Sequence, residues 1–249
     1  MKIEIDALCH KGMVRDNNED ALTINGLLLR DDSASLTVNI SGEGSFTLLV
    51  ADGMGGHEQG EEASEYALES IQQRFNDHLI GSDTFEDDMR QTTRDIALRL
   101  NRLAAERGQQ LAMGCTLTGL IWHCGRTWLV NAGDSRTYRL RNGMLRQMTT
   151  DETERGMTGN PEASKLLLNC LGGGQEGRLA VTEMTGKVLA DDLFLICSDG
   201  LCDMVSDDEI EQALIDGVTA ADLYRMACEG GGVDNVSVIL ARCESDVSI

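Results

Sequence analysis

The feature that most constrains the fold is the order in which strand-like and helix-like segments follow one another along the chain. Short apolar or alternating runs, which are typical of strands, occupy both halves of the sequence, and helical periodicity is concentrated in two blocks between them. Asn142-Gly143 joins two of these runs and is a pair of residues that favours a tight hairpin turn. Strands in hairpin order around blocks of helices predict antiparallel sheets covered by helices, which is an α+β architecture.

The same periodicity sets approximate bounds for each segment. We expect strands at residues 3–7, 22–29, 46–51, 116–122, 127–131, 137–140, 145–148, 178–184, 193–198 and 236–241. We expect helices at residues 58–78, 85–107, 163–171, 207–216 and 220–230. Residues 151–161 are polar and rich in turn-forming residues, which predicts a loop.

Size and charge narrow the class of protein. The chain has 249 residues, of which 41% are hydrophobic, and this suits one large domain or two small ones. It contains one proline and no Ser/Gly-rich linker, so we expect a single catalytic domain over residues 1–249. Its 42 acidic residues against 21 Lys and Arg give a net charge of −21. That charge argues against binding to nucleic acid or anionic lipid, since both need a basic surface.

The sequence also bears on where the protein acts. Residues 1–6 alternate like a strand and do not resemble a secretion signal. No apolar run approaches the length of a membrane span, so we expect no membrane insertion. Several of the eight cysteines lie in apolar runs, as Cys197 does, which is typical of buried reduced thiols. These features favour a cytoplasmic location.

Four acidic clusters lie next to apolar runs and beside glycine or another small residue. They contain Glu19-Asp20, Asp52, Asp199 and Asp234. Carboxylates in this setting are hard oxygen ligands of the kind that Mg²⁺ and Mn²⁺ prefer. One such cluster could be solvated surface charge, but four in the same local context predict a metal site.

The segment after the apolar run 46–51 is rich in glycine. Glycine lets the backbone approach a ligand closely, so a metal there could bind the Asp52 carboxylate and a backbone carbonyl together. The alternative is a plain strand-to-helix turn in which Asp52 or Glu58 helps to cap the helix. His57 follows the glycines and is a candidate general acid, although a single histidine can equally be structural.

The charged segment 12–20 carries an arginine ahead of its two carboxylates. It could be an ordinary exposed loop. However, the planar guanidinium of Arg15 matches the oxygens of a phosphate group, and Glu19 and Asp20 are suited to divalent cations. An arginine beside hard divalent cations is the combination expected for the chemistry of phosphate esters.

Six motifs, taken in order, resemble the metal-dependent serine/threonine phosphatases of the protein phosphatase 2C family, and they cover nearly the whole chain. They are Gly12-x-x-Arg15-x-x-Asn18-Glu19-Asp20, Asp52-Gly53-Met54-Gly55-Gly56-His57, Met113-Gly114-Cys115-Thr116, Ala132-Gly133-Asp134-Ser135-Arg136, Ser198-Asp199-Gly200-Leu201 and Asp234-Asn235. The resemblance implies a four-layer αββα sandwich, in which two antiparallel sheets are flanked by helices and the metal site lies at one edge.

The resemblance also implies a set of metal ligands. Asp52 would bridge two Mn²⁺ or Mg²⁺ ions, and the Gly53 carbonyl would bind one of them. Glu19, Asp199 and Asp234 would complete the second ion. Asp134 would join Asp199 in binding a weaker third ion.

Three further roles follow from the same resemblance. Arg15 would bind the substrate phosphate, Asp20 would hold a metal-bound water, and His57 would protonate the leaving alkoxide. The chain departs from the family pattern at Cys115, where a second threonine is usual, and at Glu152-Thr153, where His-Ser is usual. The second departure lies in the region that forms the flap beside the active site in the family, so it bears on substrate choice.

The function expected from these features is hydrolysis of phosphoserine and phosphothreonine by a metal-activated water. We expect a monomer that acts on a phosphoprotein and opposes a bacterial Hanks-type kinase, with control of type VI secretion as one setting. Two alternatives remain open at this point. One is a pseudophosphatase that keeps the fold as a regulatory binding module, and the other is a partner-switching phosphatase with a single phosphoserine protein as its substrate.

Overall fold

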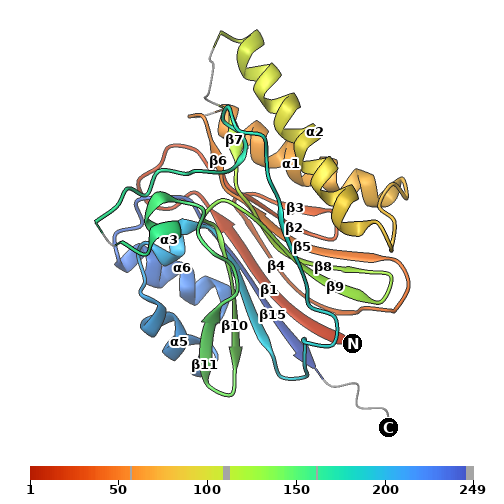
Figure 1. The fold of residues 1–249 in the computed structure, drawn as a ribbon. Coiled ribbons are helices and arrows are strands. Elements are labelled where there is room, and N and C mark those ends of the chain that lie inside the picture. The colour runs from red at the N-terminus through yellow and green to blue at the C-terminus, as the bar shows by residue number, and fades with distance from the viewer. Residues whose placement is uncertain (57, 109–112, 161, 245–249) are drawn as a thin grey trace.

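The computed structural model describes residues 1–56, 58–108, 113–160 and 162–244, and two large antiparallel sheets form its centre (Figure 1). The first sheet has the strand order β11-β10-β14-β15-β1-β4. Its strands are β1 (Lys2–His10), β4 (Asp32–Asn39), β10 (Arg136–Arg141), β11 (Met144–Gln147), β14 (Leu193–Cys197) and β15 (Val236–Glu244). β1 pairs with β15 along its whole length, so the two ends of the described chain lie side by side in this sheet.

The second sheet has the order β13-β9-β8-β5-β2-β3. Its strands are β2 (Ala21–Ile24), β3 (Leu27–Leu29), β5 (Ser45–Ala51), β8 (Leu117–His123), β9 (Arg126–Ala132) and β13 (Ala180–Glu183). A small third sheet has the order β12-β7-β6, with β6 (Gly53–Met54), β7 (Gly114–Cys115) and β12 (Leu171–Gly172). It continues from the end of β5 and leads the chain into the first helix.

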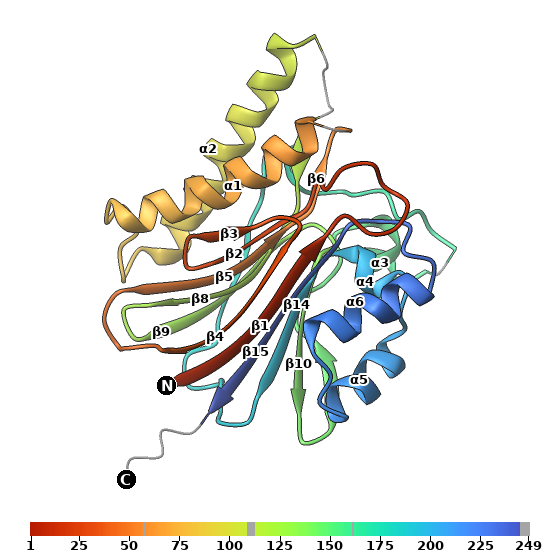
Figure 2. The ribbon, with the colours of Figure 1, turned by 180° about the vertical axis from the view of Figure 1, so that it is seen from behind.

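Helices cover the outer face of each large sheet, as Figure 2 shows from behind. α1 (Glu58–Asn76) and α2 (Phe85–Glu106) pack on the second sheet, and α5 (Asp207–Ile215) and α6 (Ala220–Glu229) pack on the first. Two short helices, α3 (Glu154–Thr158) and α4 (Asp199–Cys202), lie in loops at one end. One apolar cluster fills the space between the sheets, and two others fill the spaces between each sheet and its helices. The four-layer αββα sandwich is therefore confirmed.

The expected segments are reproduced with several differences, and the short strands β6, β7 and β12 were not expected. Residues 22–29 form a hairpin and not one strand, because Asn25 and Gly26 take φ angles of 50° and 90° and turn the chain back. β4 was not expected, although Ala34, Leu36 and Val38 alternate toward the inner cluster. α4 was also not expected, and α3 occupies part of the expected loop 151–161.

The helix expected at residues 163–171 is wrong. This segment is irregular where the structure describes it, and Leu167 forms an isolated bridge with Thr153. Leu166 and Leu168 are 70% and 46% exposed, so no apolar surface is available to hold a helix there. The helical prediction failed because local periodicity does not report whether a packing partner exists.

Five cysteines are buried, and all eight are free thiols. Within the described residues, no helix has both the length and the apolar character needed to cross a bilayer.

Candidate metal centre

Strand ends from both sheets meet at one edge and bring the acidic clusters together. Glu19 and Asp20 precede β2, and Asp52 follows β5, which is paired with β2 through Ala21 and Ala51. Asp199 begins α4 directly after β14, and Asp234 precedes β15, the neighbour of β14. Two pairs of neighbouring strands that are far apart in the sequence, β2 with β5 and β14 with β15, therefore bring their carboxylates to the same edge of the sandwich.

Hydrogen bonds of the Asn235 side chain join the loops of the two sheets at this edge. The Glu19 backbone N–H donates to the Asn235 side-chain oxygen at 2.8 Å, and the Asn235 amide donates to the carbonyls of Lys11 and Asn17 at 2.9 Å. Asn235 is 5% exposed. Its role is to hold the loop that carries Glu19 against the loop that carries Asp234.

Asp20 is the most deeply buried of the candidate residues. It is 1% exposed, and its Oδ2 accepts a hydrogen bond from the Ser198 hydroxyl at 2.6 Å, while its Oδ1 has no partner. Burial raises the pKa of Asp20 to about 7; the hydrogen bond from Ser198 opposes the rise, and the nearby charge of Asp199 adds to it. An unpartnered buried carboxylate oxygen is costly, which indicates a missing donor or cation.

Asp52 lies at the centre of the acidic group. Burial raises its pKa well above the usual range, and the charges of Asp20, Asp199, Asp134 and Asp234 raise it further, in that order. The Asp52 backbone N–H is fixed by the Thr116 hydroxyl at 3.0 Å, so the position of this residue is set by the fold.

The pKa values of Asp199 and Asp134 are raised by the same two causes, burial and nearby negative charge. Burial raises the pKa of Asp199 to about 6, and the charges of Asp234 and Asp203 contribute. Burial raises the pKa of Asp134 to about 7, and Asp199 is its first acidic neighbour. Several carboxylates that favour protonation at neutral pH in one place form a set that divalent cations would stabilise.

Arg15 is the one predicted phosphate ligand, and it lies at the rim of this group. Its Nη2 is 2.6 Å from Asp234 Oδ2, and the two side chains are 50% and 32% exposed. The predicted phosphate-binding and metal-binding residues are therefore direct neighbours. Arg15 forms an ion pair with Asp234, which the family resemblance assigns as a metal ligand.

Glycines permit the close packing around Glu19. A Cβ atom on Gly53 would lie 2.1 Å from the Gly60 carbonyl oxygen and 2.4 Å from the Glu19 carbonyl oxygen. A Cβ atom on Gly60 would lie 2.0 Å from Glu19 Oε2. The Ser64 hydroxyl also donates to the Glu19 carbonyl at 2.6 Å. Gly60 and Ser64 were not predicted, because their closeness to Glu19 arises only when α1 packs across the end of β2.

The carboxylates share the edge but do not yet surround a common point. Within residues 1–56, 58–108, 113–160 and 162–244, no group of three His, Cys, Asp or Glu side chains is placed to hold a metal ion in this arrangement. One of these carboxylates is engaged by a cation of the chain, because Asp234 Oδ2 accepts a hydrogen bond from Arg15 Nη2 at 2.6 Å. The donor set fits a hard cation in its chemistry. The predicted acid, His57, lies outside the described residues.

A cavity of about 540 Å³ adjoins the acidic group and includes Asp134 and Asp199 in its wall. Its other charged residues include Arg155 and Lys165, from the segment around α3. Lys165 forms an ion pair with Asp203 at 2.5 Å. This is the region in which the sequence departs from the family pattern.

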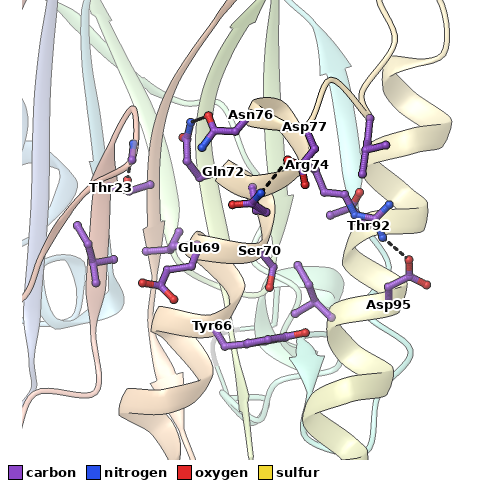
Figure 3. Close-up of a pocket in the computed structure, with 16 residues that line it drawn as sticks. Thr23, Tyr66, Glu69, Ser70, Gln72, Arg74, Asn76, Asp77, Thr92 and Asp95 are labelled. Atoms are coloured by element: carbon purple, nitrogen blue, oxygen red, sulfur yellow. Dashed lines mark hydrogen bonds and ion pairs between the residues drawn. The ribbon is translucent and has the colours of Figure 1, made fainter.

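A separate cavity of about 630 Å³ lies between α1, α2 and the β2–β3 hairpin (Figure 3). Its polar side chains bind one another: Arg74 pairs with Asp95 at 2.7 Å, and Gln72 donates to Asn76 at 3.1 Å. None of the candidate site residues lines it. It has the character of a packing gap between helices and not of a reactive centre.

Comparison with known proteins adds independent findings. The family described as protein phosphatase 2C matches residues 23–228. The chain is 33% identical over 251 residues to the serine/threonine protein phosphatase PstP of Mycobacterium tuberculosis. That alignment covers 93% of this chain and 43% of the relative, so the chain spans less than half the length of that protein.

Two solved structures are similar to the fold over almost its full length. The catalytic domain of PstP in complex with two manganese ions has a TM-score of 0.75 and 31% identity, covering 98% of this chain and 100% of that one. PppA of Pseudomonas aeruginosa, described as a key regulatory component of T6SS, has a TM-score of 0.75 and 26% identity, covering 96% and 97%.

Proposed function

The chain belongs to the protein phosphatase 2C family, and from that premise we propose that it is a metal-dependent phosphatase of phosphoserine and phosphothreonine in proteins. One observation carries the proposal furthest. Asp20, Asp52, Asp134 and Asp199 gather at one edge with pKa values raised by burial and by one another. Such a group is unfavourable without cations and favourable with them, and Arg15 stands beside it.

We assign the metal ligands residue by residue. Asp52 and the Gly53 carbonyl would hold the ions from the end of β5, and Glu19, Asp199 and Asp234 would complete the set. The two manganese ions in the PstP structure support two ions here. After burial, the charge of Asp199 is the next cause that raises the pKa of Asp134, and this closeness supports the proposal that the two residues would hold a third, weaker ion. Mg²⁺ is the other ion that suits these oxygen ligands.

The roles of the remaining residues follow from their positions. Bound divalent cations would supply positive charge and an activated water. Arg15 would bind the phosphate group with its guanidinium fork, and Asp234, its present ion-pair partner, would be one of the residues that hold a metal. The free Oδ1 of Asp20 accepts a hydrogen bond from the attacking water and holds it in position. His57 gives a proton to the leaving alkoxide, and this role stays a prediction from the sequence.

The biological setting is proposed on narrower grounds. The relative PstP is a serine/threonine protein phosphatase by name, and PppA is described as a regulator of T6SS. These names support a phosphoprotein substrate, with type VI secretion as one setting. A Hanks-type kinase as the enzyme that phosphorylates this substrate is proposed from the family resemblance of the sequence alone. A cytoplasmic monomer is the form we propose.

A direct test compares phosphate release from phosphoserine and phosphothreonine peptides with and without Mn²⁺. We expect turnover with Mn²⁺ and none in excess EDTA. Turnover that survives EDTA would refute the metal assignment. Mn²⁺ binding without turnover on any phosphopeptide would instead indicate a pseudophosphatase, and turnover of a single phosphoserine protein only would indicate a partner-switching phosphatase.

A further inference from the structure

A second charged hollow lies at the shared edge of the two large sheets, farther along β10 from the acidic group. Its volume is about 470 Å³, and it has no lining residue in common with the cavity that contains Asp134 and Asp199. We call it the basic pocket, because four of its lining side chains are cations: Arg139, Arg141, Arg146 and Lys187. This concentration is unusual in a chain with a net charge of −21.

Strand register places three of these cations on one surface. Arg139 of β10 lies directly opposite Arg146 of β11, and Arg141 follows two residues later on the same face of β10. Like charges in opposite positions on paired strands repel each other and destabilise the pair. β11 is the edge strand of its sheet, and β13, which supplies another wall, is the edge strand of the other.

Counter-charges are too few for these cations. Arg141 takes the one buried carboxylate nearby, binding Asp192 at 2.5 and 2.6 Å. Lys187 donates to the Glu183 backbone carbonyl at 2.9 Å, and the Glu183 carboxylate is held by Arg126.

Arg139 and Arg146 have no comparable partner. Among the residues that the structure describes, neither guanidinium makes an ion pair or a hydrogen bond, and Arg139 Nε is buried without a partner. Burial and the nearby charges of Arg141 and Arg146 lower the pKa of Arg139, and the charge of Asp192 offsets part of this shift. An unpaired donor of this kind costs free energy unless something binds to it.

We propose that the basic pocket binds a small phosphate-bearing ligand at a site separate from the metal centre. Two unpaired guanidinium groups match the two negative charges and the oxygen geometry of a phosphate monoester. The remaining lining includes Leu129, Met148, Met184 and Leu189, which suit an apolar group attached to the phosphate. The volume is in the range of small-molecule sites.

Phenylphosphonate is a suitable probe, because its carbon–phosphorus bond resists a phosphatase. Calorimetric titration of the whole chain in EDTA is expected to show one saturable site, since the acidic group without metal repels anions. Inorganic phosphate is expected to bind more weakly because it lacks the apolar part.

Variants locate the binding. Arg146→Gln is expected to weaken phenylphosphonate binding by about tenfold or more in EDTA, and adding Arg139→Gln to weaken it further. The matched control is Arg99→Gln with Arg102→Gln, which removes two exposed cations from α2. Equal weakening in this control would reduce the effect to general electrostatic attraction and overturn the proposal, as would the absence of saturable binding.

A stability measurement separates a binding role from a structural one. Because Arg139 and Arg146 repel each other in the free protein, Arg146→Gln is expected to raise the melting temperature without ligand. Saturating phenylphosphonate is expected to stabilise the wild-type chain more than the variant. A variant that melts lower than wild type without ligand would show that Arg146 stabilises the fold, and the site assignment would fail.

Discussion

Asp52 has no neighbour in the chain that could take over its position at the metal centre. The next acidic residue, Glu58, begins α1 and is turned to the exposed acidic surface of that helix. The four carboxylates that raise the pKa of Asp52 come from four other segments, so Asp52 is the point where these segments meet. Its removal should affect every ion at the site.

We expect Asp52→Ala to reduce turnover of p-nitrophenyl phosphate by at least about 10²-fold, because the electrostatic stabilisation from both ions is lost. Calorimetry should show Mn²⁺ binding lost in parallel. Asp87→Ala, which removes an exposed carboxylate from α2, is the control and should bind Mn²⁺ as wild type does. Full activity in Asp52→Ala would contradict the metal assignment.

Arg15 forms an ion pair with Asp234 in the structure, and the proposed function gives it the substrate phosphate as a second partner. Arg15→Ala should raise KM, because Arg15 contacts the phosphate in both the ground state and the transition state. The same change frees Asp234 from its ion pair, so Mn²⁺ affinity should stay equal or increase. Steady-state kinetics at saturating Mn²⁺ and a Mn²⁺ titration check both parts. A fall in Mn²⁺ affinity would show that Arg15 positions Asp234 instead of competing for it.

His57 is predicted to act on the leaving group alone. His57→Ala should lower kcat on phosphoserine peptides by roughly 10²–10⁴-fold, the usual value of general acid catalysis. It should change kcat little on p-nitrophenyl phosphate, whose leaving group needs no proton. The ratio of the two kcat losses is the measurement. Equal losses would mean that His57 only supports the Gly55-Gly56 turn.

At the scale of elements, the path from β5 through β6 into α1 decides the geometry of the site. Gly53 lets β6 pass between the Gly60 and Glu19 carbonyls, and the Gly53 backbone N–H donates to the Glu19 carbonyl at 3.2 Å. A side chain at this position would push α1 away from the strand that follows Glu19. The helix thus belongs to the metal centre although it supplies no predicted ligand.

We expect Gly53→Ala to destabilise the fold by about 1–3 kcal/mol, the usual cost of overpacking. Its added Cβ would meet two backbone oxygens that cannot rotate away. Mn²⁺ affinity should fall as well, since Glu19 must shift. Denaturant unfolding measures the first effect. Gly42→Ala has no atom within 4 Å of the new Cβ and serves as the control.

The segment at residues 163–171 and the strand β4 show where the local sequence pattern did not predict the secondary structure. The run at 163–171 is apolar enough to suggest a helix, yet Leu166 and Leu168 remain exposed and the segment is irregular. β4 shows the reverse case. Its alternation is visible in the sequence, but only pairing with β1 reveals that a strand at this edge completes the sheet.

At the scale of the whole molecule, the acidic edge couples metal binding to stability and pH. Asp20 and Asp134 have pKa values of about 7 and Asp199 of about 6 in the folded chain, against 3.8 for an ordinary aspartate. At a pH between the unfolded and the folded pKa values, these three carboxyl groups stay protonated in the folded chain but have lost their protons in the unfolded chain. Stability therefore falls as pH rises through this range.

We expect the metal-free protein to lose stability as pH rises from about 4 to 7 through these groups, and Mn²⁺ to restore it near neutral pH. Urea unfolding in EDTA at several pH values measures the trend. Exposed ion pairs change with pH as well, so the informative quantity is the difference between wild type and Asp52→Asn. That difference should grow with pH in EDTA and reverse in Mn²⁺; a constant difference would rule out the electrostatic explanation.

The sequence by itself determined the layered α+β class, most helix and strand positions, and the residues that bear chemistry. These features depend on local periodicity and on short motifs, which are written in neighbouring residues. The family resemblance then supplied the sandwich and the proposed roles of residues such as Asp52 and Arg15.

Only the tertiary structure decided which distant groups are neighbours and which lack partners. The pairing of Arg15 with Asp234, the free oxygen of Asp20 and the packing of Gly60 against Glu19 depend on contacts between segments far apart in the chain. The unpaired charge of Arg139 is of the same kind, because strand register places Arg146 opposite it and, within the part of the chain that the structure describes, neither side chain forms an ion pair. Burial, register and the balance of charge are properties of the folded surface, and a linear pattern does not contain them.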